Sequence, residues 1–124
     1  MTNLSFQQKI AILRILLDII NADGRIDERE TYFFNKVSNT LGLTEEDREY
    51  VSDANSLLCV VEINHFEDEQ KKWLAELMGQ LIVVDEDINV NEMAIYELVC
   101  KTCNIGTQFE EVVTEEQLKN STRS

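Results

Sequence analysis

The sequence predicts an all-α fold, a compact bundle of about five to seven helices with an internal pseudo-two-fold repeat. The 124 residues include no proline and only four glycines, which are too few turn residues for an all-β fold. Hydrophobic residues make up 44% of the chain, enough to build a globular core. One pattern of apolar and capping residues occurs twice. Matching residues of the two copies are separated by the same number of positions, the number that separates Asn89 from Asp27.

The first copy begins with an apolar stretch at residues 10–22, which predicts a helix. Its polar residues are Arg14, Asp18 and Asn21, and their spacing places them on one narrow stripe of that helix. A helix that is apolar on all its other faces must be surrounded by protein.

A turn and a second helix complete this copy. Ile26 is the apolar residue of the turn and is expected to point inward. Asp27 with Glu30 three residues later is a capping-box pattern at the start of a helix that ends at Gly42. The apolar face of this helix carries Phe33, Val37 and Leu41.

The second copy repeats these roles with different residues. The polar stripe of its first helix consists of Glu76 and Gln80, and its turn contains Asp85 and Ile88. Its second helix is capped by Asn89 and Glu92, and the apolar face of that helix carries Ile95, Val99 and Cys103. We therefore expect residues 10–43 to superpose on residues 72–105 by an approximate two-fold rotation.

The segment between the copies is expected to add two short helices. Thr44 and Asp47 should cap a helix that runs to about Ser52. Residues 56–63 are a continuous apolar run that fits helix or strand, and the helical surroundings favour helix. Together these elements form one domain at residues 1–105, followed by a partly disordered extension at 106–124.

Charge and cysteine content restrict the function classes. The formal net charge of −13 disfavours binding to nucleic acids and membrane surfaces and suits a basic protein partner or a cation. Three cysteines, Cys59, Cys100 and Cys103, cannot all pair within the chain, which indicates a reducing compartment. We expect a cytoplasmic protein.

The turn carries a resemblance to a known family. Ala22-Asp23-Gly24, Ile26, Asp27 and Glu30, between a buried and an amphipathic helix, resemble the TerB-like family of tellurite-resistance domains, which also occurs in J-domain co-chaperones. The resemblance covers roughly residues 4–105, and the second copy departs from it by lacking the glycine. It implies an all-α fold, an acidic surface that binds cations, and a stress-response role without established enzymatic chemistry.

Two interpretations of the acidic turn stay open. Residues 23–30 match the second half of an EF-hand loop, so Asp23, Asp27 and Glu30, with Asn21, could offer oxygen ligands to Ca²⁺. Ile19 stands at the first ligand position and cannot coordinate. Alternatively, Asp27 and Glu30 only cap the helix.

No catalytic constellation is evident, so we expect a protein that is not an enzyme. Cys100 and Cys103 form a CxxC late in a helix, where Cys103 is better explained as a small core residue. His65 stands alone, and Trp73 and the phenylalanines are expected in the core. The sequence predicts a TerB-like domain that binds a protein partner and weakly a divalent cation; the alternative is a small acidic inhibitor or immunity-type protein that neutralises a basic partner.

Overall fold

The computed structural model describes residues 3–84 and 88–106, and this part of the chain consists of six helices without a strand. The helices are α1 (Phe6–Ile20), α2 (Glu28–Thr40), α3 (Asp47–Asp53), α4 (Ser56–Asn64), α5 (Asp68–Val83) and α6 (Val90–Thr102). The all-α prediction is confirmed. Of the predicted C-terminal extension, residues 107–124 lie outside the described residues. Within the described residues, no helix combines the length and apolar content that a bilayer crossing requires.

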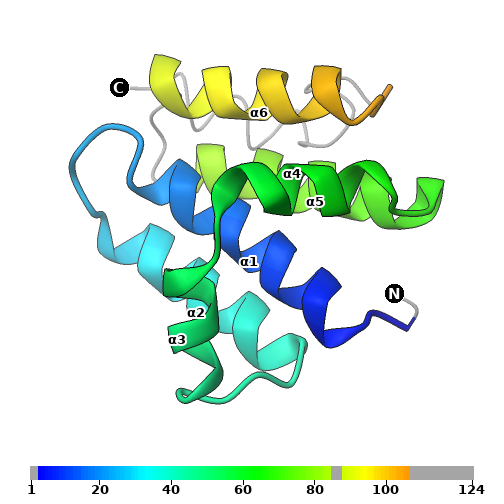
Figure 1. Ribbon diagram of the computed structural model, residues 1–124. Coiled ribbons are helices and arrows are strands. Elements are labelled where there is room, and N and C mark those ends of the chain that lie inside the picture. The colour runs from blue at the N-terminus through cyan, green and yellow to red at the C-terminus, as the bar shows by residue number, and fades with distance from the viewer. Residues whose placement is uncertain (1–2, 85–87, 107–124) are drawn as a thin grey trace.

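Helix α1 is the centre of the fold. It packs against each of the other five helices, and Figure 1 shows it crossing the middle of the molecule between α6 on one side and α2 and α3 on the other. Ile12, Leu13, Leu16 and Ile19 are fully buried. The expectation that this apolar helix is surrounded by protein is confirmed, because so much apolar area leaves water only when every face is covered.

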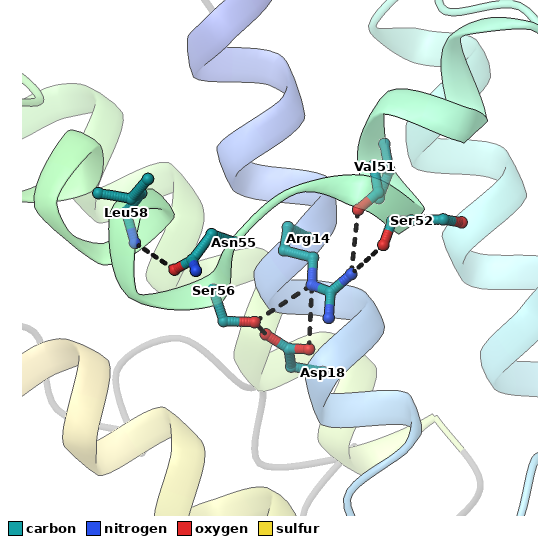
Figure 2. A network of polar contacts seen from close by, with 7 residues as sticks. All are labelled: Arg14, Asp18, Val51, Ser52, Asn55, Ser56 and Leu58. Atoms are coloured by element: carbon teal, nitrogen blue, oxygen red, sulfur yellow. Dashed lines mark hydrogen bonds and ion pairs between the residues drawn. The ribbon is translucent and has the colours of Figure 1, made fainter.

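The polar stripe of α1 faces another part of the chain, the connection between α3 and α4 (Figure 2). The Arg14 guanidinium donates from Nη1 to the carbonyl oxygens of Val51 and Ser52, at 3.1 and 2.8 Å, and from Nε to Ser56 Oγ at 3.2 Å. Asp18 completes the network: its Oδ2 accepts from Ser56 Oγ at 2.6 Å, and its Oδ1 lies 3.3 Å from Arg14 Nε.

This network, hereafter the Arg14 clasp, joins three helices. Arg14 donates to two carbonyl groups in the last turn of α3, and Asp18 accepts a hydrogen bond from Ser56, the first residue of α4. Arg14 and Asp18 are only about a fifth exposed, so water competes weakly for their hydrogen bonds.

Both short helices predicted between the copies are present. Thr44 and Asp47 exchange reciprocal hydrogen bonds before α3, from Thr44 N–H to Asp47 Oδ2 at 2.9 Å and from Asp47 N–H to Thr44 Oγ1 at 3.3 Å. The ambiguous run at 56–63 is the helix α4, whose first turn Asn55 caps through Leu58 N–H.

Helices α2 and α6 end in the same way. Gly42 and Asn104 both have a positive φ, of 76° and 58°. In each case the residue after them donates its amide back to the last turn: Leu43 to the Ser38 carbonyl at 3.1 Å, and Ile105 to the Cys100 carbonyl at 2.8 Å. These local matches agree with the offset in the sequence, while the two-fold rotation relating the complete units stays a prediction.

The expectation that Ile26 points inward is wrong, because this side chain is 68% exposed. A residue just before a helix N-cap is buried when it packs against the fourth helical residue, and in α2 that residue is the exposed, polar Thr31. The corresponding pair of α6, Ile88 and Met93, is apolar and partly buried against the core.

Two aromatic residues also depart from expectation. Phe6 is 41% exposed because it stands in the first turn of α1, and it packs edge-on against Tyr50 with ring centroids 5.5 Å apart. Trp73 is only partly buried against the core.

The three cysteines are free thiols that belong to the core or its margin. Cys103 is fully buried, and its Sγ lies 3.4 Å from the Val60 carbonyl oxygen, which connects α6 to α4. Burial raises the pKa of Cys59 and Cys103, and it raises the pKa of Cys100 to about 11.

We predict that the Arg14 clasp contributes substantially to stability. Arg14→Met should lower the free energy of unfolding by about 2 kcal/mol, since it leaves Asp18 and two carbonyl groups without their charged donor. Arg29→Met is the matched control, because Arg29 pairs with Asp27 at an exposed position and such pairs contribute about 0–1 kcal/mol. Urea denaturation followed by circular dichroism measures both; equal losses would contradict the prediction.

We also predict that the folded protein protects its thiols. At pH 8, iodoacetamide should modify Cys100 on the order of a hundredfold more slowly than in the urea-unfolded chain, because the pKa lies near 11 instead of 9.0 and only the thiolate reacts. The raised pKa values favour folding below pH 9.0, and this contribution is lost as the pH rises towards 11. Mass spectrometry after timed alkylation checks the prediction, and equal rates in both states would refute it.

Candidate functional site

The acidic turn, residues 21–27, joins α1 to α2. Asn21 is the exposed C-cap of α1. Gly24 has a φ of 76°, with no atom within 4 Å of where a Cβ would stand, so the backbone conformation, and not lack of space, favours glycine here. Asp23 Oδ1 accepts a hydrogen bond from Arg25 N–H at 2.9 Å, which fixes the bend.

Asp27 begins α2 as its N-cap. Its Oδ1 accepts from the Arg29 backbone N–H at 2.7 Å and from Arg29 Nε at 3.1 Å, and its Oδ2 accepts from Arg29 Nη2 at 3.2 Å. The hydrogen bonds from the Arg29 side chain and backbone hold the pKa of Asp27 below its usual 3.8. Both carboxylate oxygens of Asp27 are thus engaged by its own helix.

Glu30 closes the capping box from inside the protein. Its Oε1 accepts from Asp27 N–H at 3.3 Å, as the sequence predicts, but its side chain is only 1% exposed. Glu92, at the same position of α6, is fully buried as well. The spacing of a capping box predicts the hydrogen bond but not this burial, which results from the packing of α2 and α6 against α1 and α5.

The structure therefore places the candidate ligands as parts of a helix cap. The carboxylates of Asp27 and Glu30 both accept hydrogen bonds from backbone amides at the start of α2. The carboxylate of Asp23 accepts one from the Arg25 amide within the turn. Over residues 3–84 and 88–106, no three His, Cys, Asp or Glu side chains are grouped so as to hold a metal ion. The helix cap formed by Asp27 and Glu30 is present, and the binding of a cation at this turn stays a prediction.

The start of α6 lies beside this turn. Asn89 caps α6 by accepting from the amides of Asn91 and Glu92, at 2.8 and 3.2 Å, in the role predicted for it. The Asn91 side-chain amide donates to the Ala22 carbonyl oxygen at 3.3 Å, so the two copies touch here. Asp85 belongs to the segment 85–87, outside the described residues.

The other candidates do not assemble into a reactive centre. His65 is exposed at the C-cap of α4, and Cys103 is buried under α4. Prediction from the sequence missed a shallow groove on α5, lined by Glu69, Lys72, Trp73 and Glu76. The spacing of Glu69, Trp73 and Glu76 on one helical face was the available signal.

Comparisons with known proteins agree with the fold. A solved structure of a protein of unknown function from Porphyromonas gingivalis W83 superposes with a TM-score of 0.73 and 23% sequence identity, over 90% of this chain and 96% of that one. At this identity the likeness shows the fold alone. No match was found among curated proteins. The family model described as "Tellurite resistance protein TerB" matches residues 1–53, the segment that contains the acidic turn. This match over residues 1–53 is consistent with the TerB-like helical family, which the residues of the turn resemble.

Proposed function

We propose that this protein is a non-enzymatic TerB-like domain that binds a basic protein partner through its acidic surface. The observation that carries the proposal is the charge: 24 carboxylate residues stand against 11 lysines and arginines. Among the described residues, Asp18 pairs with Arg14 and Asp27 pairs with Arg29. Exposed carboxylates therefore dominate the surface potential, which speeds association with a positively charged partner.

One group of exposed acidic residues lies on α3 and in the turn before it. Glu45, Glu46, Glu49 and Asp53 are all exposed, and Arg48 is the single cation among them. Rim charges of this kind govern association rate and salt dependence more than affinity. The proposal places the protein in the cytoplasm, where its free thiols stay reduced.

The state of the nucleophilic residues supports a binding role over catalysis. A catalytic cysteine needs a lowered pKa, whereas burial raises the pKa of all three thiols in this chain. The match to TerB supports the same assignment by family resemblance.

A divalent cation is a second, weaker part of the proposal, located at residues 21–30. A cation there must compete with the amides that already occupy Asp23, Asp27 and Glu30. Because Ile19 also stands where a ligand is needed, we expect a dissociation constant no tighter than about 10⁻⁴ M.

We predict that the partner is basic and is held by charge. Crosslinking of the tagged full chain in cells, followed by mass spectrometry, should recover one dominant protein of high isoelectric point. The purified complex should dissociate in about 0.5 M salt, because screening at that ionic strength removes attraction between exposed charges. A neutral or acidic partner, or a complex unaffected by salt, would contradict the proposal.

The calcium prediction is tested by amide NMR of the full chain. Calcium titration should produce saturable shifts confined to residues 21–30. Asp23→Asn should abolish them, because it removes a charged ligand and keeps an oxygen acceptor for Arg25 N–H. Shifts spread evenly over the acidic surface, or retained in Asp23→Asn, would mean that the turn is a helix cap only.

A further inference from the structure

Helix α4 presents an apolar face to solvent. Leu57, Leu58 and Val61 are 77%, 69% and 56% exposed, although they belong to a helix whose opposite side, with Cys59 and Ile63, is in the core. Their spacing places the three on one side of the helix, and we call them the α4 face. Contiguous exposed apolar residues with a polar rim are typical of protein-binding surfaces.

The α4 face is held rigidly. Ser56, at the start of α4, is bound by both residues of the Arg14 clasp, and Asn55 caps the first turn through Leu58 N–H (Figure 2). In the middle of the helix, the Val60 carbonyl oxygen accepts a hydrogen bond from the Cys103 thiol. A partner would therefore meet apolar side chains whose backbone is already ordered, which lowers the entropy cost of binding.

The chain segments before and after α4 carry mainly carboxylates. The chain has no lysine or arginine between Arg48 and Lys71, but it has six carboxylate residues there: Glu49, Asp53, Glu62, Glu67, Asp68 and Glu69. Asp53 precedes α4 and is exposed, and Glu62 is a partly exposed residue of α4 itself. An occupant must therefore offer apolar side chains in the centre and positive charges at the edge.

We propose that the α4 face binds an amphipathic helix of the partner, with an apolar stripe flanked by lysine or arginine. This inference rests on the proposed function and adds the surface and the class of partner segment. Helix-on-helix recognition uses anchors at such a spacing. A second copy of this chain does not suit the face, because a symmetric contact would bring the same carboxylates together. An anionic lipid surface would be repelled for the same reason.

The test uses the full chain and an amphipathic helical peptide built of leucine and lysine, with affinity measured by isothermal titration calorimetry. Leu57→Gln with Leu58→Gln should weaken binding by at least about tenfold, because two anchors of the size of leucine are lost. Ile26→Gln with Val90→Gln is the matched control, since these side chains are equally exposed elsewhere and should leave affinity unchanged. A leucine–glutamate peptide of the same pattern should not bind.

Each outcome decides the proposal. Selective loss in the Leu57/Leu58 variant, together with rejection of the leucine–glutamate peptide, supports the α4 face. Equal weakening in both variants, binding of both peptides, or no binding of the leucine–lysine peptide overturns it. A dimer in light scattering that dissociates in the Leu57/Leu58 variant also overturns it, because the occupant is then a second copy. The proposed function fails separately, when the crosslinked partner is not basic.

Discussion

The enclosure of α1 is the constraint on which the rest of the structure depends. A helix with apolar residues on nearly every face is stable in water only when other elements surround it, and the five other helices do so here. Its two polar residues inside this enclosure, Arg14 and Asp18, need partners that are themselves protein. The clasp they form therefore joins α1 to the end of α3 and the start of α4.

Features encoded within a few residues were predictable from the sequence. The capping box at Asp27 and the cap at Asn89 follow from short-range hydrogen bonds, and the closing turn at Gly42 follows from backbone conformation. Features that depend on distant segments were not predictable. The acceptors of Arg14 lie some forty residues along the chain, and no local pattern identifies them.

The candidate site shows the same division. The three-residue spacing indicated that Asp27 and Glu30 form a capping box, and the structure contains it. The spacing did not indicate that Glu30 is buried among the packed helices. Nor did periodicity distinguish the outer side of α4 from its inner side, because its residues are apolar on both. Charge pattern was the better guide to the exposed surface, since carboxylates without nearby cations are visible in the sequence itself.

The central position of α1 has a consequence for synthesis. This apolar helix leaves the ribosome before all the helices that cover it, and the last of them, α6, ends at Thr102. At about 5–20 residues per second, the roughly eighty intervening residues take on the order of ten seconds to translate. During that time its apolar faces are incompletely covered. The nascent chain is thus a substrate for chaperones that bind exposed apolar helices, even though the finished protein buries most of the apolar residues of α1.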